Sequence, residues 1–382
     1  MKLNIREKDF PTRNKFVYLN AANVALMYTG AEKVISQWQK DVAQNGSNNF
    51  NEKAEENVFI GLHRAAGRLI NADPESIAAG SSATELLCSL AWAVSPGKDH
   101  NVISTEIVFP STVYPWQRVA NSTGCEIRLV KEKNNFIQID DLIELIDRNT
   151  AVISISHVEY ANGQTFDLEL LAEAAHDHNA LLVVDATQSA GAIPIDVQKS
   201  PIDVLVSGAY KWLCGPFGSA FMYIAPHLLD KLEPGLVGFR SHENMWDLDG
   251  GRITYPATGR KFEFSTMAFG SALGLAESIN YINDLGVDNI FRHNNRLAQR
   301  LIEGLQARGA EITSPLGGED RSAIVMAYFE HNDPDEMINS LNQDQVFVSC
   351  RGKSIRFSPH IYNTSENIDK ALAAIDTCIV KP

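Results

Sequence analysis

The chain has 382 residues, of which 45% are hydrophobic and 21% charged, the composition of an ordinary globular protein. This length exceeds that at which one hydrophobic core keeps growing, so we expect two domains. The formal net charge of -14 argues against a nucleic-acid-binding protein, which needs a concentrated basic surface, and no apolar stretch is long enough to span a membrane.

Seven apolar strands, most of them separated by helical stretches, are predicted in the first two thirds of the chain: 76–79, 101–104, 126–130, 151–156, 180–184, 204–207 and 220–224. Helical patterns such as 140–147 and 168–177 lie between them. Strands that alternate with helices indicate right-handed crossovers and a mostly parallel seven-stranded sheet covered by helices. The fold class is therefore α/β, and ligands of such sheets bind at the carboxyl ends of the strands.

The pattern changes after about residue 225. Residues 233–262 are rich in Gly, Pro and polar groups and predict a long loop, which in a compact domain is usually functional or disordered. A helical stretch at 267–308 follows, then short strands at 322–329, 345–349 and 354–357 and an amphipathic helix at 365–379. We expect a large α/β domain at residues 21–265 and a smaller α+β domain formed by residues 1–20 and 266–382.

Residues 80–85, with the sequence Gly-Ser-Ser-Ala-Thr-Glu, lie between the predicted strand 76–79 and a predicted helix at 86–94. Small residues let backbone N–H groups approach an anion, and the start of a helix adds a favourable dipole. The alternative is a capping box, because Ser82 and Glu85 have the S-x-x-E spacing that closes a helix. Both can hold, because a capped helix still offers free N–H groups.

Two strand ends carry the side chains that point most strongly to a chemistry. Asp185 closes the apolar strand 180–184, and Lys211 follows the strand 204–207, flanked by Tyr210 and Trp212. A buried carboxylate facing a pyridine nitrogen and a lysine within reach of an aldehyde are what pyridoxal 5'-phosphate (PLP) requires of a protein. The ordinary alternatives are an Asp185 that caps a turn and a Lys211 that reaches solvent from a loop.

Two segments around these residues resemble a known family. Residues 185–191 (DATQSAG) and 207–216 (SGAYKWLCGP) look like the signature of class V aminotransferase-fold PLP enzymes, and the likeness runs from residues 18–22 to 355–363. That family includes cysteine desulfurases, kynureninases and isopenicillin N epimerase-like proteins. The resemblance implies fold type I, PLP as cofactor, an amino-acid substrate and a homodimer with a shared active site.

In this interpretation Lys211 forms the Schiff base with PLP and moves protons at the substrate Cα. Asp185 holds the pyridine proton, and Gln188 is positioned to donate to the phenolic oxygen of the ring. The resemblance further implies that Phe109 stacks on the cofactor, with a buried core Phe as the alternative. It also assigns a set of phosphate contacts, the last of them across the dimer interface: Ser82, Ala83, Thr84, Ser207, Tyr210 and Thr266.

The substrate end is assigned to Arg356 on the predicted strand 354–357. A guanidinium fork binds a carboxylate with two hydrogen bonds, and the family has an arginine at this place before a Tyr-Asn pair. The alternative is a solvent-facing strand arginine. Asn23, Tyr160 and Trp246 are further candidates to line the pocket.

The sequence departs from the desulfurase pattern at two places. The thiol closest to Arg356 in sequence is Cys350, which shares one face of the predicted strand with Val346 and Val348, so we expect its sulfur to pack inward. Persulfide chemistry at Cys350 is therefore not expected. The asparagine that many desulfurases have beside the ring is not evident in residues 157–164, and this stretch resembles the kynureninase and epimerase-like branch.

The five cysteines are scattered, odd in number and never spaced as C-x-x-C, which favours reduced thiols and disfavours a zinc site. His176 and His178 would face apart on a helix, and we expect them to be solvated surface residues without a metal. The chain start lacks the apolar core of a signal peptide. We expect a cytoplasmic protein with no nucleic-acid, membrane or metal partner.

The predicted function is PLP-dependent chemistry on a small α-amino acid, either amino transfer or desulfurase-like C–S lysis. The alternatives are a kynureninase-like hydrolase, an epimerase and a non-catalytic PLP-binding relative, because the fold does not determine the reaction. A nucleotide-binding α/β protein is disfavoured, because neither G-x-G-x-x-G nor G-x-x-x-x-G-K-[ST] opens a helix.

Overall fold

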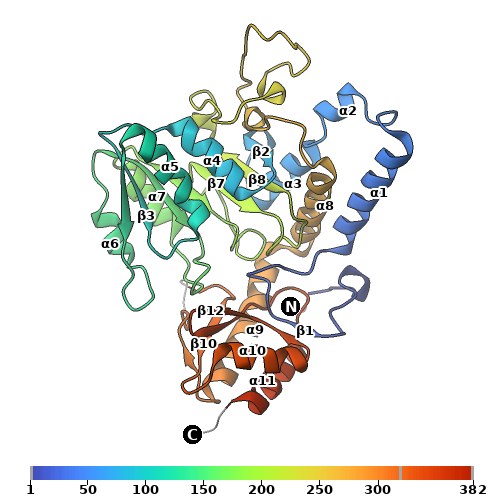
Figure 1. The fold of residues 1–382 in the computed structure, drawn as a ribbon, viewed down its shortest axis with the longest axis vertical. Helices are drawn as coiled ribbons and strands as arrows, with labels where there is room; N and C mark the ends of the chain where they lie inside the picture. Colours follow the sequence, from blue (N-terminus) through green and yellow to red (C-terminus); the bar gives the residue numbers. More distant parts are fainter. Residues whose placement is uncertain (1–2, 318–320, 380–382) are drawn as a thin grey trace.

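The computed structural model describes residues 3–317 and 321–379 (Figure 1). A seven-stranded sheet forms the centre of its larger part, with strand order β2-β8-β7-β6-β5-β3-β4. β8 runs antiparallel to both of its neighbours, whereas the other pairs are parallel. The prediction of a mostly parallel seven-stranded sheet is confirmed, and its strands are β2 (Ile77–Gly80), β3 (Asn101–Thr105), β4 (Glu126–Val130), β5 (Thr150–Ser156), β6 (Leu181–Asp185), β7 (Val204–Gly208) and β8 (Ala220–Ile224).

Helices cover both faces of this sheet because successive strand residues point to opposite faces and both sets are apolar. On β7, Val204 and Val206 face a cluster with α4 (Ala83–Val94) and α5 (Tyr114–Thr123). Leu205 faces the opposite cluster, to which α3 (Ile60–Ile70), α6 (Ile139–Glu144) and α7 (Leu168–His176) contribute. None of the helices in the described residues is long and apolar enough to cross a membrane.

The N-terminal segment runs between the two parts of the molecule. Strand β1 (Val17–Tyr18) pairs in parallel with β11 (Val346–Phe347) near the other end of the chain. The helices α1 (Thr29–Asn45) and α2 (Glu52–Glu56) follow, and α8 (Phe269–Leu285) packs against α1 and α3 beside the large sheet (Figure 1). The division into two domains at residues 20 and 266 stays a prediction. The position of α8 beside the large sheet favours a domain boundary between α8 and the next helix, α9 (Val287–Gln306).

The C-terminal part is a four-stranded sheet of order β12-β13-β10-β9 with three helices. Its strands are β9 (Glu311–Ile312), β10 (Val325–Tyr328), β12 (Ser349–Arg351) and β13 (Ser354–Phe357), and its helices are α9 (Val287–Gln306), α10 (Pro334–Gln343) and α11 (Ser365–Cys378). The single strand predicted at 345–349 is wrong. The chain leaves β11, which pairs with β1, and enters β12, which pairs with β13 in a different sheet.

Residues 233–262 are irregular, with short 3-10 turns at Phe239–Ser241 and Gly259–Phe262, and part of the segment projects from the molecule above α2 and β2 (Figure 1). Its base is firmly attached. The buried guanidinium carbon of Arg240 lies 4.9 Å from the ring centroid of Phe59 and 5.7 Å from that of Phe269. Just beyond the loop, the buried Glu263 carboxylate accepts hydrogen bonds from the backbone N–H of Ala79 on β2 (2.8 Å) and pairs with His63 (2.5 Å).

Candidate active site

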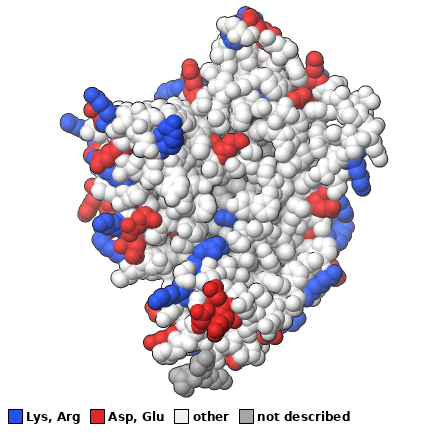
Figure 2. Space-filling model, viewed as in Figure 1, with Lys and Arg blue, Asp and Glu red and all other residues white. Residues whose placement is uncertain are grey.

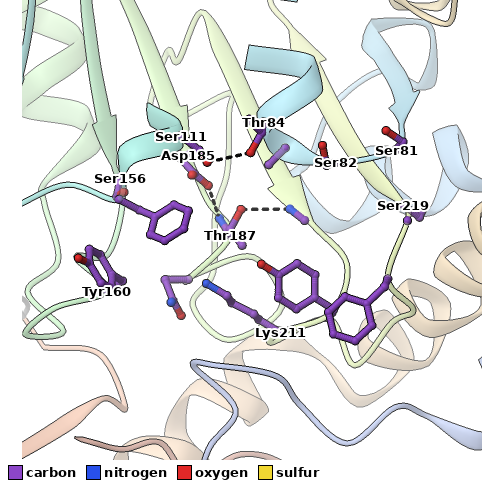
Figure 3. A pocket seen from close by; sticks show the side chains of 17 residues that line it. Ser81, Ser82, Thr84, Ser111, Ser156, Tyr160, Asp185, Thr187, Lys211 and Ser219 are labelled. Atoms are coloured by element: carbon purple, nitrogen blue, oxygen red, sulfur yellow. Dashed lines mark hydrogen bonds between the residues drawn. The ribbon is translucent and has the colours of Figure 1, made fainter. Parts of the chain in front are cut away.

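Residues from several strands, most of them polar, meet at one edge of the large sheet. Ser156, Asp185 and Gly208 end β5, β6 and β7, Ser81 follows β2, and Ser219 precedes the antiparallel β8. These residues line a cavity of about 190 Å³. Figure 3 shows Ser81 and Ser219 at one end of this cavity, Tyr160 and Ser156 at the other, and Lys211 between the two ends.

Nine of the predicted site residues line this cavity: Ser82, Ala83, Thr84, Phe109, Tyr160, Asp185, Gln188, Tyr210 and Lys211. The sequence prediction missed several others, namely Ser81, Ser111, Ser156, Thr187, Phe217 and Ser219. Ser81 and Thr187 belong to segments that the sequence analysis had already assigned to the site, so their place in these segments could have identified them as site residues. Ser111 and Ser156 carry no such signal, because a serine after a turn or at a strand end is common.

Lys211 is buried in the turn after β7, and its Nζ lies 5.7 Å from the ring centroid of Phe109 and 5.8 Å from that of Tyr210. The pKa of Lys211 is lowered to about 8, mainly by burial and to a smaller extent by the positive charges of Arg356 and Arg351, while the Asp185 charge opposes the shift. An amine with this pKa is substantially unprotonated just above neutral pH, which a nucleophilic lysine requires.

Asp185 is 6% exposed and presents its carboxylate at the floor of the cavity. Its Oδ1 accepts the backbone N–H of Thr187 at 2.9 Å, and its Oδ2 accepts the hydroxyl of Thr112 at 3.3 Å. A second carboxyl group, Glu159, is fully buried nearby, and burial raises its pKa to about 8, with a smaller contribution from the Asp185 charge. At neutral pH Glu159 is therefore mainly uncharged.

The amide of Gln188 is held at both ends. Its Nε2 donates to the carbonyl of Ala22 at 2.9 Å, and its Oε1 accepts the indole N–H of Trp212 at 2.9 Å. These two hydrogen bonds fix the orientation of the amide, and therefore the direction of its second N–H. On the other side of Trp212, the backbone carbonyl accepts from Nε2 of the buried His360 at 2.9 Å. Residues from three distant segments thus fix the turn that carries Lys211.

The segment before α4 combines a helix cap with free amides. The hydroxyl of Ser82 accepts the N–H of Glu85 at 3.1 Å, which is the predicted cap. The Glu85 carboxylate turns back to the N–H of Ser81 (3.0 Å) and to its hydroxyl, one residue earlier than a capping box requires. The N–H groups of Ala83 and Thr84, in the first turn of the helix, have no intrahelical acceptor. They face the cavity together with Ser219, whose buried Oγ lacks a hydrogen-bond partner among the described residues.

Arg356 is fully buried, so the alternative of a solvent-facing arginine is wrong. Its Nη1 donates to the carbonyl of Tyr160 at 3.0 Å and its Nε to the hydroxyl of Ser349 at 3.3 Å. Its Nη2 is buried without a hydrogen-bond partner in the part of the chain that the structure describes. A buried guanidinium with an unpaired N–H₂ group is costly unless an anion completes it. Burial lowers the pKa of Arg356 to about 9, which leaves it charged at neutral pH.

Five predicted residues do not line the cavity: Arg356, which is buried behind Tyr160, and four others. Ser207 is buried, and its hydroxyl donates to the carbonyl of Gly208 at 3.3 Å. Asn23 and Thr266 are exposed, and Trp246 lies in the long loop beside Phe239, with ring centroids 6.1 Å apart. The contact expected of Thr266 is to a second subunit and stays a prediction.

Cys350 is partly exposed, so the expectation that its sulfur packs inward is wrong. In the β12–β13 register, Ser349 is opposite Arg356 and Cys350 is opposite Ile355. Since neighbouring strand residues point to opposite faces, the Cys350 side chain lies on the face away from Arg356. Its Sγ donates to the carbonyl of Gly352 at 3.1 Å, and burial raises the pKa of the thiol. Cys350 is therefore a protonated thiol that points away from the candidate site.

His176 is not simply a solvated surface residue. Its Nε2 pairs at 2.9 Å with the buried carboxylate of Asp203, whose other oxygen lies 3.2 Å from Nε2 of His227. His178 is exposed and contacts the carbonyl of Ala174 at 3.1 Å, as expected for the surface of a helix. No group of three or more metal-ligating side chains with suitable geometry occurs within residues 3–317 and 321–379.

A lysine and a carboxylate at the carboxyl ends of neighbouring strands, beside an anion cradle at a helix start, are the groups that an α/β enzyme with a phosphorylated pyridine cofactor requires. The sequence model of the family described as Aminotransferase class-V matches residues 28–371, so the chain belongs to this family. The protein is therefore a PLP-dependent enzyme of fold type I.

The similar proteins carry different names. The chain is 27% identical over 367 residues to an uncharacterized aminotransferase, YcbU, of Bacillus subtilis, which covers 96% of this chain and 95% of the relative. It is 28% identical over 306 residues to a cysteine desulfurase of Haloferax volcanii, and the match covers 76% of this chain and 71% of the relative. Among solved structures, the apo cysteine desulfurase of Thermococcus onnurineus NA1 superposes with a TM-score of 0.88 at 23% identity, covering 99% of both chains. The cystine C-S lyase C-DES, in complex with its reaction product cysteine persulfide, has a TM-score of 0.86 at 20% identity. The superposition covers 96% of this chain and 98% of the C-DES chain.

The residues around the cavity fit this cofactor. The amides of Ala83 and Thr84 and the unpaired hydroxyl of Ser219 form a cradle of the kind that binds phosphate. Asp185 and Lys211 line the same cavity, and they would meet the ring nitrogen and the aldehyde of this cofactor. Phe109, which is 43% exposed, lines the cavity where a ring can stack on it, so the alternative of a buried core Phe is wrong.

Proposed function

We propose that this protein is a PLP-dependent transferase or lyase that acts on an α-amino acid, with Lys211 as the residue that attaches the cofactor. The observation that carries the proposal is the meeting of a buried amine of pKa about 8 and a buried carboxylate in one cavity. Just beyond Tyr160, the unpaired Nη2 of Arg356 adds a site for the substrate α-carboxylate.

When bound, PLP supplies an electron sink for the pair of electrons released at the substrate Cα. Asp185, held by hydrogen bonds from Thr187 and Thr112, would hold a proton at the ring nitrogen, because a carboxylate stabilises a cation beside it. Arg356 binds the α-carboxylate and thereby selects which bond at Cα is broken. Lys211 would move the proton at the substrate Cα, because its pKa lies close to neutral pH.

Amino transfer and C–S lysis are the two reactions that we favour. Relatives of the chain are named aminotransferase and cysteine desulfurase, and a structural neighbour is named a cystine C-S lyase. A desulfurase that stores sulfur on its own thiol needs a cysteine facing the substrate. Cys350, the thiol closest to Arg356 in sequence, lies on the opposite face of its strand. We therefore propose chemistry without a persulfide on Cys350, and we rank kynureninase-like hydrolysis, epimerisation and non-catalytic PLP binding below it.

We further propose a cytoplasmic homodimer in which Thr266 contacts the phosphate of the partner's cofactor. The support is that Thr266 is exposed and lies between the long loop and α8, outside the cavity of its own chain. A dimer would also explain why the loop base is anchored while the loop itself projects from the molecule (Figure 1).

Purified protein with and without Lys211→Ala tests the attachment. The wild type should be yellow, and borohydride should bleach the colour and leave a PLP mass on the peptide that contains Lys211. Lys211→Ala should lose this mass, whereas the exposed control Lys199→Ala should keep it. A wild type that stays colourless after incubation with PLP would overturn the proposal.

A panel of amino acids then separates the reactions by their products. Keto acid formed only with an amino acceptor indicates a transaminase, and ammonia released with sulfide from cysteine, or with cysteine persulfide from cystine, indicates a lyase. Alanine released from kynurenine would instead indicate the hydrolase that we rank below them. Bound PLP without any turnover would favour the non-catalytic relative.

A further inference from the structure

A second arginine lies on the same face of the β12–β13 hairpin as Arg356. Ser349 is opposite Arg356, and Arg351 is two residues further along β12, so the alternation of a strand directs Arg351 and Arg356 to one face. Arg351 is half-buried, and its Nη1 contacts the carbonyl of the preceding residue at 2.6 Å. Figure 2 shows basic side chains in the hollow between the upper and lower parts of the molecule, close to this hairpin.

Both guanidinium groups lie on this face of the hairpin and act electrostatically on the amine of Lys211. The charge of Arg351 lowers the pKa values of Lys211 and Arg356, so the three cations lie within electrostatic reach of one another. None of the ion pairs formed by residues 3–317 and 321–379 includes Arg351 or Arg356. In a chain with a net charge of -14, a cluster of unpaired cations indicates a site for an anion.

One α-carboxylate cannot neutralise this face. Asp185 lines the cavity and is assigned to the cofactor ring, and the neighbouring Glu159 is mainly uncharged at neutral pH. The phosphate cradle at Ser82, Ala83 and Thr84 lies at the end of the cavity away from Tyr160, and the carbonyl of Tyr160 is bonded to Arg356 (Figure 3). A carboxylate on Arg356 therefore leaves one guanidinium without a counter-charge.

We infer that Arg351 is a second anion-binding group of the substrate site and that the preferred substrate is an α-amino acid whose side chain ends in an acidic group. Arg356 takes the α-carboxylate, and Arg351 takes the acid of the side chain. This inference rests on the proposed function and narrows it to acidic amino acids. It requires no new chemical step, because the side-chain acid is bound and does not react.

Unreactive acids of matched shape test the inference on the PLP-loaded enzyme. Succinate carries two carboxylates, and butyrate replaces one of them by a methyl group. Isothermal titration calorimetry should give a dissociation constant for succinate about ten-fold or more below that for butyrate, as expected for one further charged hydrogen-bonded pair. Arg351→Gln should abolish the preference for succinate with little change for butyrate, and Arg351→Lys should retain part of it. Arg356→Gln should weaken the binding of both acids.

Lys353→Gln is the matched control, because it removes one exposed positive charge from the same hairpin. It should leave the preference unchanged. Equal binding of succinate and butyrate by the wild type, or a preference that survives Arg351→Gln, would overturn the inference and leave the proposed function intact. Binding of both acids that is unaffected by Arg356→Gln would contradict the proposed substrate site itself, and the inference with it.

Discussion

The two ends of the candidate active site are built in different ways. The cofactor end is formed by residues at the ends of adjacent strands, such as Asp185 on β6 and Lys211 after β7, whose positions follow from the sheet. The substrate end depends on Arg356, which reaches the site from a separate sheet and contacts Tyr160, 196 residues earlier in the chain. The strand ends of one sheet therefore position the cofactor residues, with Ala22 and His360 supporting the turn that carries Lys211, whereas the substrate end depends entirely on how two parts of the chain meet.

The largest effect is expected at the cofactor end. Asp185→Asn keeps the size of the side chain but removes the charge that holds the ring proton, and turnover should fall by about 100-fold or more, as for the loss of a charged or hydrogen-bonding group at a reacting centre. Steady-state kinetics with saturating PLP measures this. Thr112→Val, which removes only the hydroxyl that donates to Asp185, is the matched control and should lose only a few-fold. Equal turnover of Asp185→Asn and wild type would remove Asp185 from the mechanism.

A smaller effect of a different kind is expected at the substrate end. Arg356→Gln should raise KM for the amino acid by about 10- to 100-fold, because charged hydrogen bonds to the α-carboxylate are lost, while the PLP colour is retained. Loss of the colour in this variant would show that the two ends are not independent. A melting curve alongside the kinetics separates loss of binding from loss of folding, since Gln leaves the carbonyl of Tyr160 without a charged donor.

The lowered pKa of Lys211 predicts a pH dependence for the cofactor-free protein. The neutral amine is the nucleophile, so acylation of Lys211 by acetic anhydride should rise about ten-fold per pH unit and level off near pH 8. A lysine in a model peptide, with a pKa of about 10.4, should keep rising beyond pH 9. Peptide mass spectrometry at a series of pH values measures the rate at this residue. A profile for Lys211 that matches the peptide would mean that the folded chain does not depress its pKa.

The smallest effect is expected at Cys350. Cys350→Ser should leave turnover within about two-fold of the wild type, because the sulfur points away from Arg356 and a half-exposed substitution of this size rarely perturbs a fold. The measurement is sulfide or keto-acid release from cysteine by both proteins. A loss of more than ten-fold would show that the hairpin rearranges to bring this thiol to the substrate.

The same difference between the two ends explains what the sequence could predict. All seven strands of the large sheet were predicted, because most of them are short apolar runs bounded by polar residues, and the side chains at their ends follow directly. The pairing of β11 with β1 could not be predicted, because residues about 330 positions apart form it. The free Oγ of Ser219 and the unpaired Nη2 of Arg356 likewise depend on neighbours that no local pattern shows.

The bond from His360 to the carbonyl of Trp212 links these two ends. Burial lowers the pKa of His360 to about 3, so the imidazole stays neutral throughout the range in which cells and most assays operate. The imidazole that joins the C-terminal part to the lysine-bearing turn therefore does not change its protonation state under those conditions. Acidification down to about pH 4 should leave this joint closed, and any loss of catalysis in that range should have its origin elsewhere in the molecule.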